Sequence, residues 1–92
     1  MDHVTPVHPG LVLKDELDEI GVSQAALAKH LGVSLKTINE ICREKRGISA
    51  AMAVQLSQAL GASPQFWLNL QKNWELSRIK REHFGRIKRI AA

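Results

Sequence analysis

The feature that most restricts the fold of this 92-residue sequence is a pair of short helical segments joined by a tight turn that begins with a glycine. Ser23 can accept a hydrogen bond from a free backbone N–H of the first turn, which makes it a good N-cap for a helix over 24–31. Gly32 then ends that helix, because glycine takes the left-handed backbone of a sharp reversal at little steric cost. Ser34 caps a second helix, which we predict over about 35–43.

The second of these helices is amphipathic, with an apolar and a polar arc at about 100° per residue. The apolar arc consists of Leu35, Ile38, Ile41 and Cys42. The polar arc consists of Lys36, Thr37, Asn39, Glu40 and Arg43. Packing explains the apolar arc, because the preceding helix offers Leu27, Ala28 and Leu31 as an inward stripe. The polar arc is either solvated or has a partner, and two helices in this layout are typical of a helix-turn-helix DNA reader.

Start and stop signals predict three further helices and no strand, which gives an all-α, five-helix domain. Pro9 suits the first position of a helix over 9–20, and Gly21 follows its end. Ser49 caps a helix over about 50–60, and Ser63 with its following proline starts the last helix. The side chains expected to face the core are Leu13, Leu17 and Ile20 in the first helix and Ala53, Leu56 and Leu60 in the fourth.

The last helix carries two apolar stripes, which is more than one core contact needs. The first stripe consists of Phe66, Trp67, Leu70 and Trp74. The second consists of Leu68, Leu76 and Ile79. One stripe can close the core, whereas the other would be exposed in a monomer, and such a surface usually marks an interface. We expect a homodimer interface at the second stripe; binding of a different protein and cover by the N-terminal arm are the alternatives.

Positive charge is unevenly distributed around the formal net charge of +4. Residues 34–47 carry four basic and two acidic side chains, and residues 76–92 carry six and one. A positive balance suits a polyanion, although +4 alone favours nucleic acid only weakly. The acidic side chains of the first helix are Asp15, Glu16, Asp18 and Glu19. We expect them to be solvated or to contact a basic protein.

The chain is short enough for one domain, which we divide into an N-terminal arm (1–8), the helix-turn-helix domain with its dimerisation helix (9–81) and a basic tail (82–92). The tail is a solvated end, a phosphate contact or a clamp on an acidic partner. The start of the chain has no signal-peptide pattern and no apolar run is long enough for a membrane span, so we expect the protein in the cytoplasm. Cys42, the single cysteine, is expected to be a small core residue.

Enzyme and metal functions have little support in the sequence. The four histidines have no paired Cys or His at ligand spacing, so no metal site is expected. No nucleophile motif and no glycine-rich phosphate loop occurs either, so neither an enzyme nor a cofactor is expected.

Four motifs accompany the helix-turn-helix in a fixed order: HPG at 8–10, INEI at 38–41, KRGIS at 45–49 and SPQFWLNLQ at 63–71. With them, residues 6–80 resemble the HigA family, also called virulence-associated protein I, of the XRE (Cro/cI, lambda repressor-like) helix-turn-helix class. One departure is Leu11, because many relatives have an acidic residue after HPG, so any role of that acid does not carry over.

The resemblance implies a lambda repressor-like fold and the antitoxin of a type II toxin–antitoxin module. Such an antitoxin represses its own operon and neutralises a toxin that cleaves messenger RNA on ribosomes. The alternatives are a stand-alone XRE-type regulator without a toxin, and a protein-interaction module that has the fold without DNA binding.

In a major-groove complex, side chains near the start of the second helix reach base edges while flanking residues contact phosphates. The expected base-reading residues are Ser34, Lys36, Thr37, Asn39 and Glu40. Lys36 can donate to guanine, Glu40 can accept from the cytosine amino group, and Thr37 can pack on the thymine methyl. Asn39 suits adenine or a phosphate. The expected phosphate contacts are Gln24, Arg43, Lys45 and Arg46. About four or five base contacts per domain are too few to select an operator, so we expect two copies on a palindrome.

Overall fold

The computed structural model describes residues 6–79, 84–85 and 87–91. These residues contain five α-helices and no strand: α1 (Pro9–Ile20), α2 (Gln24–Leu31), α3 (Leu35–Cys42), α4 (Ala50–Leu60) and α5 (Pro64–Arg78). The predicted all-helical class and the predicted helix-turn-helix are thereby confirmed. Residues 1–5 of the arm and the basic residues Lys80, Arg81 and Arg86 lie outside the described residues.

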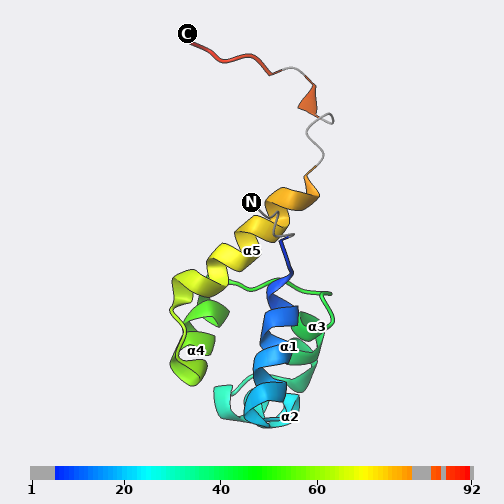
Figure 1. Ribbon diagram of the computed structural model, residues 1–92, viewed down its shortest axis with the longest axis vertical. Helices are drawn as coiled ribbons and strands as arrows, with labels where there is room; N and C mark the ends of the chain where they lie inside the picture. Colours follow the sequence, from blue (N-terminus) through cyan, green and yellow to red (C-terminus); the bar gives the residue numbers. More distant parts are fainter. Residues whose placement is uncertain (1–5, 80–83, 86, 92) are drawn as a thin grey trace.

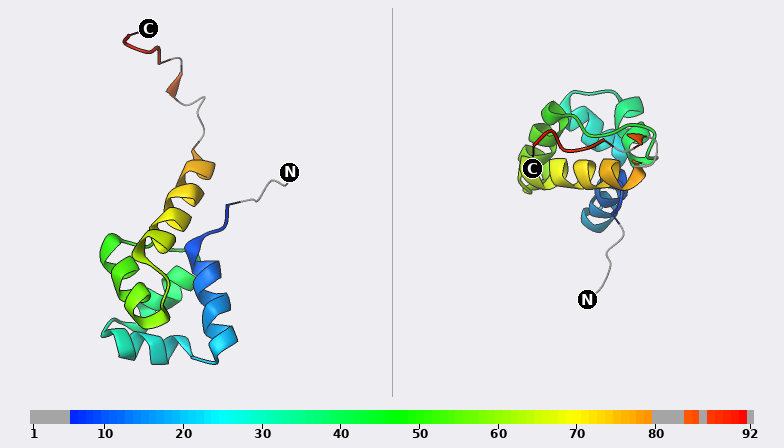
Figure 2. Two further views of the ribbon diagram at one scale, coloured as in Figure 1. Left: turned by 60° about the vertical axis from the view of Figure 1, so that its left-hand side comes forward. Right: turned by 90° about the horizontal axis from the view of Figure 1, so that it is seen from above.

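The five helices surround one small core. α1 and α2 pack on α3, while α5 packs on α4 and also contacts α1. In Figure 1, α4 and α5 lie on one side of the domain and α1, α2 and α3 on the other. Trp67 of α5, together with Ile38 and Leu56, is almost completely buried at the centre. In the left view of Figure 2, the described residues near the C-terminus, 84–85 and 87–91, lie away from the five helices.

A side chain caps the start of every helix. The hydroxyl groups of the predicted caps Ser23, Ser34, Ser49 and Ser63 each accept a hydrogen bond from the backbone N–H three residues further on. The cap of α1 was not predicted from the sequence: His8 accepts through Nδ1 from the backbone N–H of Gly10, at 2.9 Å. Caps of this kind satisfy N–H groups that have no partner within the helix.

His8 belongs to the folded domain although it is the last residue of the predicted arm. Its side chain is buried, and the edge of its ring meets the ring of Trp74 with centroids 4.7 Å apart. This contact joins the start of α1 to α5. Burial lowers the pKa of His8 below its ordinary value of 6.5, and the nearby Glu44 carboxylate opposes part of that shift.

The capping role of His8 predicts a pH-dependent stability. The unfolded chain binds a proton below about pH 6.5, whereas the folded chain resists protonation of a buried acceptor. The stabilisation is therefore complete above that pH and is lost as the pH falls through the lowered pKa of the folded state. We expect His8→Asn, which keeps a capping oxygen but does not titrate, to be less stable at neutral pH and to lose less stability on acidification. Urea titrations from pH 7.5 to about pH 5 measure the free energy of unfolding of both proteins. If its pH dependence is the same in His8→Asn and wild type, a group other than His8 causes it.

The structure corrects the predicted core at three positions. Ile20 is 49% exposed, because it is the last residue of α1 and lies beyond the turn that packs on α3. Leu35 is 50% exposed, because it occupies the first position of α3, beside the cap. On α5, Phe66 is exposed while Leu68 of the second stripe packs partly against the core. The buried residues of α5 are therefore Trp67, from the first predicted stripe, and Gln71, which lies between the two stripes.

Candidate nucleic-acid interface

The reversal between α2 and α3 has the geometry that the sequence predicts. Gly32 has φ +75°, and its N–H donates to the Lys29 carbonyl at 3.2 Å. The N–H of Val33 donates to the Ala28 carbonyl at 3.0 Å, which completes the left-handed helix end. Behind this turn, Ile38 and Ile41 are fully buried. These contacts fix α3 against α2 and leave its other face toward solvent.

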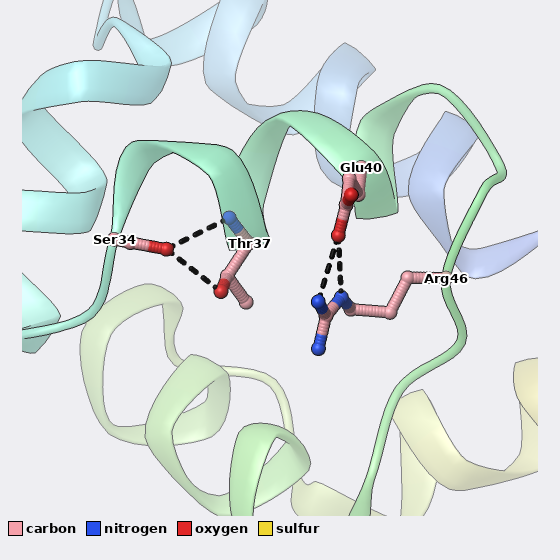
Figure 3. A network of polar contacts seen from close by, with 4 residues as sticks. All are labelled: Ser34, Thr37, Glu40 and Arg46. Atoms are coloured by element: carbon pink, nitrogen blue, oxygen red, sulfur yellow. Dashed lines mark hydrogen bonds and ion pairs between the residues drawn. The ribbon is translucent and has the colours of Figure 1, made fainter.

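The start of the polar face of α3 is ordered by a local hydrogen-bond pair. The Ser34 hydroxyl accepts from the Thr37 N–H at 3.1 Å and lies 2.9 Å from the Thr37 hydroxyl, as Figure 3 shows. Lys36, between them in sequence, is exposed. The Lys36 ammonium is therefore the charged group that this turn presents to solvent.

Asn39 and Gln24, which were assigned separately to bases and phosphates, contact each other. The Asn39 amide donates to Gln24 Oε1 at 3.2 Å, which bridges α3 and the first residue of α2. Because Oε1 of Gln24 accepts this bond, its NH₂ group is the part that can donate to a phosphate. The pair thus adds a polar clamp to the apolar packing between the two helices.

Glu40 and Arg46 form a salt bridge across the end of α3. Arg46 donates from Nε at 3.0 Å and from Nη2 at 2.7 Å, and both bonds end on Oε1 of Glu40. Figure 3 shows the Arg46 side chain reaching from the following loop back to the helix. These hydrogen bonds hold the pKa of the Glu40 carboxyl below its usual value. Glu40 is thus already paired before any nucleic acid is bound.

The loop after α3 carries the other basic residues and is fixed from behind. Arg43, Lys45 and Arg46 are all exposed. The left-handed residue of the turn is Glu44, with φ +62°, although the loop also contains Gly47. Gly47 instead permits a close approach, because a Cβ there would lie 2.7 Å from the side-chain amide of Gln71.

Gln71 is the residue of this region that sequence reasoning missed. It is 8% exposed, and its Oε1 accepts from the backbone N–H of Ile48 at 2.7 Å. Its NH₂ group donates to Glu75 at 2.9 Å, which fixes the orientation of the amide. A polar residue on a helix ordinarily indicates a solvated position, and its place between the two apolar stripes of α5 was the only signal of its burial.

The residues assigned to dimerisation lie partly on the surface. Leu76 and Ile79 are 58% and 48% exposed, whereas Leu68 is half-buried against the core. Among the described residues, no cluster of three or more His, Cys, Asp or Glu side chains is arranged to hold a metal ion. Nor is any described helix both long and apolar enough for a bilayer crossing.

The arrangement of α2 and α3 defines a helix-turn-helix protein, and comparison with known proteins leads to the same class. A family model described as helix-turn-helix matches residues 13–67. Virulence-associated proteins A′ and I of Dichelobacter nodosus are 45% and 44% identical over 75 and 77 residues, which are 80% and 83% of this chain. The chain spans 65% and 71% of the length of those two proteins.

Two solved structures are similar over nearly the whole chain. Pseudomonas aeruginosa antitoxin HigA with the higBA promoter is 42% identical, with a TM-score of 0.85 and coverage of 95% of this chain and 99% of that one. Antitoxin GraA in complex with its operator is 42% identical, with a TM-score of 0.84 and coverage of 100% and 98%. The chain therefore belongs to the XRE-type helix-turn-helix family and, within it, to the HigA-type antitoxins. This is a family of regulators and antitoxins and not of enzymes.

Proposed function

We propose that this protein is a sequence-specific DNA-binding repressor that acts as the antitoxin of a toxin–antitoxin pair. The observation that carries the DNA-binding part is the division of α3 into two faces. Ile38 and Ile41 are fully buried, while Lys36 on α3 and Lys45 and Arg46 in the loop that follows are exposed. The solved structures of the HigA and GraA relatives hold promoter or operator DNA, which supports the same role here.

In this proposal α3 enters the major groove, and the contacts divide by position. Ser34, Lys36 and Thr37 lie near the start of the helix, where side chains reach base edges. Asn39 is partly engaged by Gln24, so its remaining amide N–H and its oxygen are the groups available to a base or phosphate. The expected phosphate contacts are Gln24, Arg43, Lys45 and Arg46. Two copies on a palindromic operator would double these contacts and supply the selectivity that one domain lacks.

Lys36→Ala is expected to weaken operator binding by roughly 1 to 3 kcal/mol, because the exposed ammonium donates to guanine acceptors in the groove. The measurement is a fluorescence-anisotropy titration with a duplex from the region upstream of the protein's own gene. The matched control is Lys14→Ala, which removes the same charge from an exposed position on acidic α1. Equal affinities of Lys36→Ala and wild type would remove Lys36 from the set of reading residues. If the wild type does not prefer its upstream region over a scrambled duplex, the proposed function as a sequence-specific repressor is wrong.

The antitoxin part of the proposal rests on family membership and on the surface of α1. Asp15, Asp18 and Glu19 are exposed on this helix, which is suited to a basic partner. Beside its C-terminal end lies an apolar groove of about 300 Å³, lined in part by Ile20 and Leu60. We propose this acidic face and groove as the docking surface for the toxin, which would cleave messenger RNA.

Co-expression with the neighbouring reading frame tests this part. A basic protein of about 90 to 110 residues encoded beside this gene should co-purify with the untagged chain and lose its toxicity in its presence. A complex that leaves Asp15, Asp18 and Glu19 fully exposed would exclude the docking surface. A stand-alone regulator would bind its operator and have no such neighbour, whereas a protein-interaction module would leave no footprint on the operator.

A further inference from the structure

We propose that Glu40 is a positioning residue for DNA binding: it does not read a base but holds the Arg46 guanidinium ready to contact a phosphate. This inference rests on the proposed function and assigns to Glu40 a role different from the cytosine contact that the sequence suggests. The role of Glu40 is then to order the Arg46 side chain of the loop after α3 before DNA is bound.

The geometry of the salt bridge favours positioning over base reading. Two N–H groups of Arg46, on Nε and Nη2, converge on the single oxygen Oε1 of Glu40 at 3.0 and 2.7 Å. Nη1 and the second N–H of Nη2 are not used in this contact and can donate to a phosphate oxygen. Oε1 of Glu40 already accepts both of these bonds, so a cytosine contact would have to use Oε2, the oxygen that Arg46 does not engage.

The backbone of the loop is fixed independently of this pair. At its start, the Lys45 N–H donates to the Glu40 carbonyl at 2.8 Å. At its end, the Ile48 N–H donates to the buried Gln71 amide at 2.7 Å. Because both ends of the loop are fixed, rotation of the long Arg46 side chain is the main freedom left, and Glu40 restricts it. An arginine that is ordered before binding loses less conformational entropy when it meets a phosphate.

Charge alone predicts the opposite effect of Glu40, which makes the role testable. A carboxylate on a surface that meets the DNA polyanion repels it, so removal of the charge would tighten binding on electrostatic grounds. Removal of a positioning residue would weaken binding, and would do so equally for every base sequence, because phosphates are the same throughout. A base-reading Glu40 would instead lose discrimination at one base pair.

The experiment is a titration of wild type, Glu40→Ala, Glu40→Gln, Arg46→Ala and the Glu40→Ala/Arg46→Ala double variant against the operator, its single-base variants and a scrambled duplex. We expect Glu40→Ala to bind all duplexes about two- to tenfold more weakly, with unchanged ratios between them. Glu40→Gln loses the same charge but keeps an acceptor oxygen, so its affinity should lie between those of Glu40→Ala and wild type. In the Arg46→Ala background, Glu40→Ala should cause no further loss, and Arg46→Ala itself should lower the salt dependence by about one ion.

Each other outcome has a definite meaning. Equal or tighter binding by Glu40→Ala in the wild-type background overturns the inference, as does a loss confined to one base pair. A loss that persists at full size in the Arg46→Ala background also overturns it, because Glu40 would then act without Arg46. Unchanged thermal unfolding of Glu40→Ala, a change at a partly exposed side chain, serves as the folding control. Absence of operator preference in the wild type would instead count against the proposed function.

Discussion

Replacement of Gly10 by alanine is expected to lower the free energy of unfolding by about 3 kcal/mol or more, at the upper end of overpacking effects. A Cβ at this position would lie 1.8 Å from the Ile41 carbonyl oxygen and 2.7 Å from its carbonyl carbon. Both atoms are backbone of α3, so no side-chain rotation can relieve the overlap. In an exposed helix interior the same change would be favourable by about 1 kcal/mol, so the steric effect must outweigh a gain in helix propensity.

Urea unfolding of wild type, Gly10→Ala and Gly61→Ala separates the two reasons for which this chain uses glycine. Gly61 has φ +92° and no atom within 4 Å of an added Cβ, so Gly61→Ala should cost only about 1 kcal/mol for its left-handed backbone. A Gly10→Ala protein as stable as the wild type would contradict the close contact between α1 and α3.

The contact at Gly10 also bears on DNA recognition. It is the point at which the backbone of α1 touches α3, the proposed reading helix, and His8 caps α1 two residues earlier. The HPG motif therefore sets the spacing between α1 and α3: His8 and Pro9 start the helix, and Gly10 lets it lie directly on the Ile41 carbonyl. Sequence reasoning used Pro9 as a helix start but treated His8 and Gly10 only as marks of family resemblance.

The helix boundaries were predictable because the signals for them are local. Ser34 caps α3 with its own side chain, and Gly32 ends α2 through its own backbone conformation. Such signals act over three or four residues and do not depend on the rest of the fold. The buried stripe of α3 was predictable for a similar reason, since Ile38 and Ile41 are one turn apart on the same face.

The polar contacts of the candidate site were not predictable, because they join residues whose proximity depends on tertiary packing. Gln71 meets the backbone of Ile48, 23 positions away, and Asn39 meets Gln24, 15 positions away. A single sequence indicates neither contact, and a lone polar residue on a helix is ordinarily solvated. Glu40 was therefore assigned a base contact from its place on the polar arc, and no sequence pattern indicated that Arg46 would bond to its Oε1. The dimer interface on the exposed side of α5 remains a prediction.

Leu76→Glu is expected to convert the protein from a dimer to a monomer and to weaken operator binding by at least about a hundredfold. Loss of a buried interface side chain costs roughly 2 kcal/mol, and a twofold dimer contains this side chain twice. Leu76, in the last turn of α5, is 58% exposed, and Ile79, the C-cap residue that follows the helix, is 48% exposed. In a twofold contact each Leu76 would meet apolar surface of the partner, where a carboxylate would be desolvated without a counter-charge.

Sedimentation equilibrium measures the mass of wild type, Leu76→Glu and the control Val54→Glu, and anisotropy measures their operator affinity. Val54 is 44% exposed on α4, so its substitution places the same charge on a comparably exposed apolar residue outside the proposed interface. Loss of the dimer in both variants would indicate a general effect of charge and not an interface on α5. A dimeric Leu76→Glu protein would mean that the subunits do not pair through Leu76 of α5. A monomeric wild type that still selects its operator would mean that one copy of α3 with its basic loop supplies the selectivity.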